Sequence, residues 1–312
     1  MAAATDFGPL AATAHHRRFF PAAEPWIYAS PALILILTIL IVPLGIGVSY
    51  AFRNLVLLDP FSGEFIGTEH FVEIWKDGNF WNALRNTVEW TVISVLLQFV
   101  FGLILALLLT QPFPGRWLVQ ALVFLPWAVP SFLSGLNWAW LFNPAVGPLP
   151  HWFVGVGLMT TPDNILSNPA LALWGPIAAN VWWGIPFYAI TLLAALQAIP
   201  ADIYEAAEID GAGPIMRFWS ITLPFLAPTI AITLLLRAVW IANAADLIVV
   251  MTRGGPADST QILASYIFAQ AFQRLDFGYA SAIATVLLVL LLIYAAFVIT
   301  IRQLINRAHG GL

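Results

Sequence analysis

The sequence predicts an all-α integral membrane protein with six transmembrane helices. Of its 312 residues, 61% are hydrophobic and only 9% are charged, whereas a soluble domain has roughly 45–50% and 25%. Too few polar side chains remain to cover a compact soluble surface. The charged residues also leave several uncharged stretches longer than the roughly 20 residues that a membrane helix requires.

The composition also excludes several classes of function. There are 12 basic and 16 acidic residues, and the formal net charge of −4 disfavours a nucleic-acid partner, which would require a basic surface. The absence of cysteine excludes disulfides, thiolate nucleophiles and cysteine metal sites. The histidines lie outside the long apolar stretches and lack the spacing of a zinc site, so we expect them to be solvated or interfacial; they are His15, His16, His70, His151 and His309.

The uncharged stretches give six expected spans in chain order. These are residues 26–52, 88–111, 118–142, 170–198, 221–250 and 277–301. Together they form one membrane domain over residues 26–305, with tails at 1–25 and 306–312. The first apolar stretch is too long for the core of a signal peptide, and we expect an uncleaved anchor. An even number of spans places both tails on the same side of the membrane.

Two connections between spans are expected to be ordered. Residues 53–85 mix charges with aromatic side chains, which predicts a small folded cap on the outer face. Residues 259–273 place Ile262, Tyr266 and Ala269 at helical spacing, which predicts a short interfacial helix.

The connection between the fourth and fifth spans, residues 199–220, is the most informative. Pro200 would start a helix, and Asp202 would cap it with Glu205 three residues later in a capping-box arrangement. Gly211 would end this helix, and a second short helix over residues 215–220 would lead into the fifth span. This pattern predicts a rigid helix–turn–helix in water rather than an ordinary amphipathic loop.

This segment resembles the EAA loop of the permease subunits of binding-protein-dependent ABC importers. The motif appears here as Glu205-Ala206-Ala207, Asp210-Gly211-Ala212 and Ile221-Thr222-Leu223-Pro224. Three further features are similar to the carbohydrate-importing branch, of which the maltose importer is the familiar example: Asn86-Thr87 opening the second span, Asn180 with Gly184-Ile185-Pro186-Phe187 in the fourth, and Thr252-Arg253-Gly254-Gly255-Pro256 after the fifth. The resemblance covers about residues 26–305 and implies the MetI-like transmembrane fold.

The resemblance also implies an orientation and a set of partners. Counting basic residues on the two sides of the membrane gives six against five, which decides nothing. In the family the loop is a coupling helix that faces the cytoplasm, which places both termini there, in the bacterial inner membrane. The implied partners are a second homologous permease forming a heterodimer, two ABC ATPase subunits, an extracytoplasmic solute-binding protein, membrane lipid and a small carbohydrate.

The loop residues that the resemblance assigns to ATPase coupling are Glu205, Ala206, Ala207, Glu208, Asp210, Gly211, Leu223 and Pro224. The small alanines would let the helix seat closely in a groove of the ATPase, and the two glutamates could pair with basic groups there. The sequence contains no phosphate-binding GxxxxGK[ST] loop. ATP and Mg²⁺ are therefore expected on the ATPase subunits, and we expect no catalytic residue, metal ligand or cofactor in this chain.

Two helical stripes, one in the fourth span and one in the fifth, supply candidate residues for the substrate pathway. Their amide, charged and aromatic side chains suit the hydroxyls and CH faces of a sugar, although packing remains an alternative for either tryptophan. The candidates are Asn180, Trp183, Gly184, Phe187, Arg237, Trp240, Asn243 and Asp246. We expect Asn180, Phe187, Arg237 and Trp240 to line one cavity near mid-membrane.

Two features of the fifth span bear on the ligand. Arg237 and Asp246 are nine residues apart, about 13.5 Å along a helix, which is too far for a direct ion pair. The family often has a bulky aromatic residue where this chain has Ala244 and Ala245. This difference would leave room for a different or larger ligand than maltose.

The sequence therefore predicts the permease subunit of an ATP-driven ABC importer for a sugar, glycoside or sugar derivative. One alternative is an ABC permease for a non-sugar solute, which usually has a five-span core. Another is an ion-coupled transporter, which needs membrane carboxylates where this chain offers only Asp246. An intramembrane enzyme would need a catalytic pair or metal ligands within the spans. Arg237 could serve an anionic sugar or satisfy backbone carbonyls.

Overall fold

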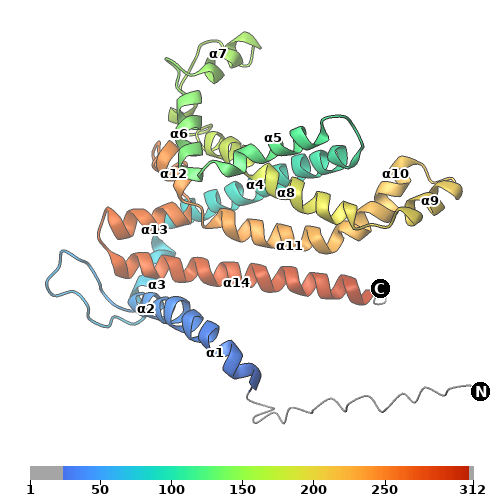
Figure 1. The fold of residues 1–312 in the computed structure, drawn as a ribbon. Helices are drawn as coiled ribbons and strands as arrows, with labels where there is room; N and C mark the ends of the chain where they lie inside the picture. The colour runs from blue at the N-terminus through green and yellow to red at the C-terminus, as the bar shows by residue number, and fades with distance from the viewer. Residues whose placement is uncertain (1–23, 309–312) are drawn as a thin grey trace, which may run out of the picture. The chain divides into compact units, whose positions relative to one another are not determined.

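The structure, a computed structural model, describes residues 24–308 and is built from helices (Figure 1). The chain divides into two compact units, Met1–Ser49 and Tyr50–Leu312, which we describe separately. The expected tails at 1–25 and 306–312 lie almost entirely outside the described residues.

The described part of the first unit lies in one long apolar helix, which ends at Tyr50, the first residue of the second unit. This helix consists of α1 (Glu24–Ile36), a π-helical turn (Leu37–Ile41) and α2 (Val42–Tyr50). Apolar residues surround the helix on all sides, which is the pattern of a segment that crosses a bilayer. Its position agrees with the expected span at 26–52.

In the second unit, α4 (Gly78–Thr110), α8 (Trp174–Gln197) and α14 (Phe277–Ala308) match the expected second, fourth and sixth spans. Helix α4 starts ten residues earlier than expected because Asp77 caps it, with its Oδ1 accepting a hydrogen bond from Asn79 N at 2.9 Å. The Asn86-Thr87 pair therefore lies inside the helix, and its place at the start of the membrane-spanning part stays a prediction.

The expected third span, 118–142, is not one helix. It is formed by α5 (Arg116–Ala128) and α6 (Ser131–Leu141), which meet at an angle of 93°. Val129 between them has extended backbone angles, φ −81° and ψ 126°, because the ring of Pro130 disfavours a helical residue before it. The described residues thus contain five helices suited to crossing a membrane, or six if this bent pair is one span.

The expected fifth span, 221–250, is longer and broken. It begins with α10 (Pro214–Arg217) and a π-helical turn (Phe218–Thr222), continues as α11 (Leu223–Ala242), and resumes after a break as α12 (Asp246–Met251). At the break, the Asn243 side-chain amide donates back to Val239 O at 2.8 Å, a local bond that competes with helix continuation. Asp246 therefore opens a new helix, and a distance measured along one continuous helix does not apply.

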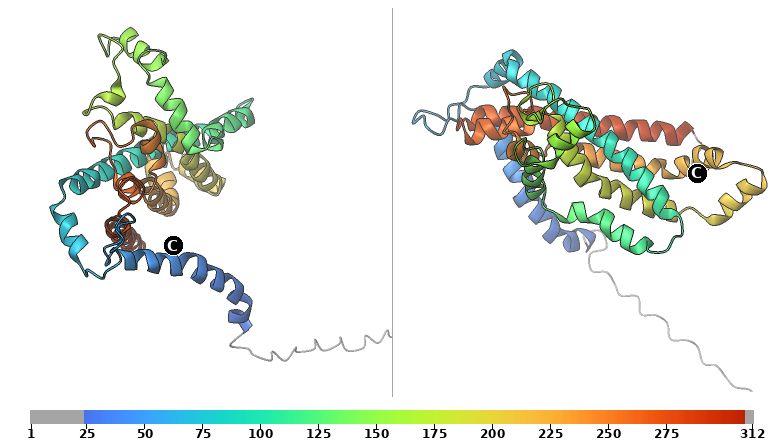
Figure 2. Two further views of the ribbon diagram at one scale, coloured as in Figure 1. Left: turned by 90° about the vertical axis from the view of Figure 1, so that its left-hand side faces the viewer. Right: turned by 90° about the horizontal axis from the view of Figure 1, so that it is seen from above.

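The core of the second unit lies where α4, α8 and α11 pack together (Figure 2). Gly102 allows this approach, because a Cβ atom there would meet Tyr188 Cβ and the backbone of Ala189. Buried Trp90 ties α4 to α11 by donating its indole N–H to Ile241 O at 2.9 Å. The three helices thus form a close-packed frame for the polar groups described below.

Two ends of the second unit carry different short elements (Figures 1 and 2). At one end lie α9 (Ala201–Ile209) and α10. At the other lie α3 (Glu69–Lys76), α7 (Pro148–Gly155), a 3₁₀ turn (Ile165–Ser167) and α13 (Leu263–Phe272). The helix expected within 259–273 is confirmed as α13, although Tyr266 on it is buried; its interfacial position stays a prediction.

Candidate functional site

The segment between α8 and α11 folds as a helical hairpin. Helix α9 begins after Pro200, which occupies the N-cap position and has no side-chain capping bond. The expected capping box of Asp202 and Glu205 is therefore wrong, because Asp202 already lies in the first turn of the helix. There its carboxylate favours the helix through the dipole rather than through a cap.

Gly211 makes the turn that ends this helix. Its φ is +81°, and the space where a Cβ would stand is empty. The requirement for glycine is therefore the left-handed backbone and not a close neighbour. The role expected for Gly211 as the turn residue is confirmed.

Two side-chain contacts hold the two arms of the hairpin together. The hydroxyls of Tyr204 on α9 and Thr222 in the π-helical turn lie 2.9 Å apart, and Thr222 is buried. Arg217 Nη1 donates to Glu208 Oε2 at 3.2 Å. Glu208, expected to pair with a partner subunit, thus has a partner within the chain. Because the π-helical turn continues directly into α11, the hairpin and α11 form one continuous helical segment.

The outer surface of the hairpin combines acidic and apolar side chains. Glu205, Ala206, Asp210 and Pro224 are exposed, while Ala207 and Leu223 are half-buried. Large apolar side chains that the sequence analysis did not single out are also exposed, namely Ile209, Ile215, Met216 and Trp219. Apolar groups gathered on a polar hairpin are typical of a surface that contacts a partner protein or the membrane.

The pathway candidates of the fourth and fifth spans meet at a buried polar cluster. Arg237 is only 2% exposed, and its Nε donates to Gln98 Oε1 at 2.7 Å. Gln98 Nε2 in turn donates to Asn180 O at 2.8 Å. Gly184 leaves room for this arrangement, since a Cβ atom there would meet Arg237 Nη2 and Gln98. Gln98 was missed by sequence reasoning, although it is the only amide side chain between Trp90 and Thr110.

Aromatic rings surround the Arg237 guanidinium. Its Cζ lies 5.1 Å from the ring centroid of Trp183 and 5.8 Å from that of Phe187, distances typical of cation–π contacts. The Trp183 indole donates to Val129 O at 2.8 Å, at the break between α5 and α6, which supports a packing role for this residue. Trp240 packs against Phe187 with centroids 5.5 Å apart but remains half exposed.

Some donors of the cluster are unused. Among the described residues, Arg237 Nη2, Asn180 Nδ2 and the Tyr188 hydroxyl are buried without a hydrogen-bond partner. Asn243 caps the end of α11 and bonds back to Val239, and Asp246 begins α12. Asn243 borders an apolar cavity between α11, α13 and α14 instead of the cluster. The expected common cavity of Asn180, Phe187, Arg237 and Trp240 stays a prediction.

Comparison with known proteins gives consistent matches. Residues 98–308 match the family model described as binding-protein-dependent transport system inner membrane component. The chain is 37% identical over 263 residues to the sulfoquinovosyl glycerol transport system permease protein SmoG of Agrobacterium fabrum, covering 84% of each chain. It is 38% identical over 228 residues to the trehalose/maltose permease protein MalF of Thermococcus litoralis, covering 73% of this chain and 76% of that one. It is 32% identical to the sn-glycerol-3-phosphate permease protein UgpA of Pectobacterium atrosepticum, covering 86% and 90%.

Solved structures show the same fold. The chain matches, with a TM-score of 0.77 and 26% identity, a chain of a bacterial ABC transporter involved in the import of the acidic polysaccharide alginate, covering 91% of this chain and 96% of that one. A chain of the inward-facing MetNI methionine ABC transporter gives a TM-score of 0.53 at 20% identity, covering 76% and 97%. At that identity the likeness concerns the fold alone.

Proposed function

The chain belongs to the binding-protein-dependent transport system inner membrane components, and from that premise we propose that it forms part of the pathway of an ATP-driven importer for a sugar, glycoside or sugar derivative. The observation that carries this proposal is that the hairpin is continuous with α11. The hairpin with its docking surface runs without interruption into α11, and α11 carries Arg237 of the buried polar cluster. A movement imposed on the hairpin would therefore reach the centre of the helix frame.

In this proposal the hairpin and both termini face the cytoplasm. Two ABC ATPase subunits bind ATP and Mg²⁺ and dock on the hairpin through its exposed apolar and acidic side chains. A second, homologous permease completes the pathway as a heterodimer. An extracytoplasmic solute-binding protein delivers the substrate to the opposite end of the unit, where α6, α12 and α13 end. The chain itself needs no cofactor.

The substrate class is supported by the relatives and by the chemistry of the cluster. The relatives are named for sulfoquinovosyl glycerol, trehalose or maltose, and glycerol 3-phosphate, which are all hydroxyl-rich. The unused donors Asn180 Nδ2, Tyr188 OH and Arg237 Nη2 suit hydroxyl or anionic oxygens as acceptors, and neighbouring aromatic rings suit the CH faces of a sugar ring. Asn180, Gly184, Phe187, Arg237 and Trp240 are the residues we assign to the pathway.

The proposal is tested by uptake into liposomes that contain the complete complex and its binding protein. Trehalose, maltose and sn-glycerol 3-phosphate serve as labelled probes, and methionine represents the non-sugar alternative. We expect uptake of at least one hydroxyl-rich probe that requires both ATP and the binding protein. Uptake of methionine with no uptake of the other probes would overturn the assignment to sugars.

The coupling role is tested in the same liposomes with two glycine variants. Gly211→Val forces a β-branched residue into φ +81°, whereas Gly213→Val is a matched control at φ −66°. The left-handed conformation costs about 1–2 kcal/mol for a non-glycine residue. We therefore expect Gly211→Val to abolish most uptake and ATPase co-purification while Gly213→Val retains both. Equal transport by the two variants would contradict a coupling role for this turn.

A further inference from the structure

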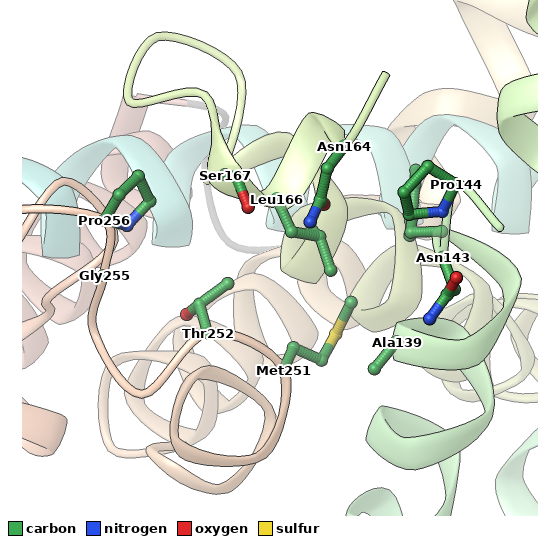
Figure 3. Close-up of a pocket in the computed structure, with 11 residues that line it drawn as sticks. Ala139, Asn143, Pro144, Asn164, Leu166, Ser167, Met251, Thr252, Gly255 and Pro256 are labelled. Atoms are coloured by element: carbon green, nitrogen blue, oxygen red, sulfur yellow. The ribbon is translucent and has the colours of Figure 1, made fainter. Parts of the chain in front are cut away.

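A cavity of about 360 Å³ opens beside the ends of α6 and α12, at the end of the second unit opposite α9 and α10 (Figure 1), and Figure 3 shows the residues that line it. Three segments form it: the end of α6 with Asn143, the turn that carries Asn164 and Ser167, and the end of α12 with Met251 and Thr252. The volume falls within the roughly 300–1,000 Å³ of small-molecule pockets. The cavity is separate from the buried cluster around Arg237.

The lining of this cavity is polar but uncharged. Its hydrogen-bonding side chains are two amides and two hydroxyls, from Asn143, Asn164, Ser167 and Thr252, and its other walls are Ala139, Phe142, Pro144, Leu166, Met251, Gly255 and Pro256. Figure 3 shows Asn164 and Ser167 on one wall facing Met251 and Thr252 on the other. The Asn164 and Ser167 side chains are exposed and therefore accessible to a solute.

Hydrogen bonds fix all three segments before any ligand arrives. Asn143 Oδ1 accepts from Ala145 N at 2.9 Å and holds the turn after α6. Asn168 Oδ1 accepts from Ala170 N at 3.0 Å, just after Ser167. The Thr252 and Thr260 hydroxyls lie 2.7 Å apart, and Thr260 also donates to Gly255 O at 2.9 Å. A site with fixed walls loses little conformational freedom on binding.

The cavity also lies close to the pathway helix. Leu166 and Met251 in its wall both pack against Gly175 at the start of α8. Gly175 precedes Asn180 of the buried cluster by five residues, about 7.5 Å along a helix. The cavity wall therefore contacts α8 about one and a half turns before the cluster.

We infer that this cavity is an outer binding site for a neutral, hydroxyl-rich group, such as one ring of the transported carbohydrate, which it holds before the ring enters the membrane. This inference rests on the proposed function. Asn143 Oδ1 and the Thr252 hydroxyl already bond within the chain. The Asn143 amide nitrogen, the Asn164 amide and the Ser167 hydroxyl are the groups that would exchange hydrogen bonds with sugar hydroxyls. The walls formed by Phe142, Met251 and Pro256 cover CH groups. A phosphate or sulfonate group would find no cation among the lining residues.

The absence of cysteine from the sequence makes the test direct. Ser167→Cys introduces one thiol of this chain at the cavity, and Thr161→Cys places a matched thiol at an exposed site outside its lining. The complete complex is treated with a maleimide, with and without trehalose or maltose, and labelling of this chain is measured by mass spectrometry. We expect the transported sugar to slow labelling at position 167 several-fold and to leave position 161 unchanged.

Filling the cavity gives a second measurement. Ser167→Phe should raise the KM for uptake several-fold and leave kcat largely unchanged, whereas Thr161→Phe should change neither. The inference is overturned if no sugar protects the thiol at 167, or if the sugar-free binding protein alone protects it fully, which would make the cavity a protein-docking site. If the wild-type complex imports no sugar probe, the proposed function itself fails; if it imports one that gives no protection, only the outer site fails.

Discussion

The Arg237 side chain links three helices through hydrogen bonds. A guanidinium removed from water requires acceptors, and Gln98 on α4 supplies one at 2.7 Å. The same glutamine donates to the backbone of Asn180 on α8, so that α4, α8 and α11 meet at one hydrogen-bonded joint. The glycine at 184 keeps the contact close. Arg237 thus holds the frame in addition to its proposed place on the pathway.

The hydrogen bonds of Gln98 with Arg237 and Asn180 predict that Gln98→Leu lowers the stability of the folded chain. This substitution leaves the buried Arg237 Nε without its acceptor, and an unsatisfied buried donor costs about 1–3 kcal/mol, or more when it is charged. We expect a lower Tm of the purified complex and less protein in the membrane. Gln111→Leu, the same change at the exposed end of α4, should have little effect. Equal unfolding temperatures for the two variants would contradict the joint.

The residues of the buried polar cluster that the sequence singles out share one property. Arg237, Asn180 and Gly184 stand out because a charge, an amide and a glycine are conspicuous in an apolar helix. Gln98 was missed because nothing in the sequence connects a neutral amide of the second span with an arginine 139 residues later. Tyr204 was missed because its partner Thr222 is 18 residues away and comes close only through the turn at Gly211.

At the scale of elements, the uncharged stretches of the sequence predicted where the helices lie but not where they bend. Residues 118–142 read as one span, yet they turn by 93° at Val129-Pro130. Residues 221–250 read as one helix, yet Asn243 bonds back to Val239 and ends it. Both breaks carry a local signal, a proline and an asparagine. Neither signal gives the direction of the next helix, which depends on packing against α8 and on the indole of Trp183 that reaches Val129 O.

The hairpin predicts a double-mutant result. If the Tyr204–Thr222 bond transmits movement from α9 to α11, then Tyr204→Phe and Thr222→Val should each lower the sugar imported per ATP hydrolysed, and the double variant should be no worse than either one. A hydrogen bond of this kind contributes about 0.5–1.5 kcal/mol. Thr285→Val on α14, where the hydroxyl bonds to Ser281 O of the same helix, is the control. Additive losses in the double variant would show that the two hydroxyls act independently.

The start of α4 predicts a response to acid. The Asp77 Oδ2 accepts hydrogen bonds from the Tyr266 and Tyr279 hydroxyls, each at 2.7 Å, and so ties α4 to α13 and α14. Burial alone would raise the pKa of Asp77, but these bonds, with backbone N–H groups of Asn79 and Phe80, outweigh it and lower the pKa below 3.8.

Because the folded pKa is depressed, the stability that the Asp77 carboxylate contributes is complete above pH 3.8 and is lost as the pH falls through the lower folded value. We therefore expect Asp77→Asn to lower the Tm of the complex at neutral pH and to differ less from wild type under strong acid. Asp163→Asn, at an exposed carboxylate, should match wild type throughout. A constant difference in Tm at all pH values would contradict the linkage.

On the scale of the whole molecule, the three sites of the second unit follow one another along α8 and α11. The outer cavity adjoins the first turn of α8, the buried cluster lies midway, and the hairpin connects the far ends of both helices. In the proposed importer, the cavity would receive the substrate, the cluster would line its passage, and the hairpin would bind the ATPases. It requires that the cavity and the hairpin lie on opposite sides of the membrane.

That requirement gives the last prediction. A phosphatase that is active only outside the cytoplasm should be active when fused after Gly157, in the connection beyond α7, and silent when fused after Leu312. Green fluorescent protein, which fluoresces only when it folds in the cytoplasm, should show the reverse pattern and serves as the internal control. The counts of basic residues, six against five, cannot predict this outcome, so it depends on the hairpin assignment. Phosphatase activity after Leu312 with fluorescence after Gly157 would place the hairpin outside, away from any ATPase, and would overturn the coupling mechanism.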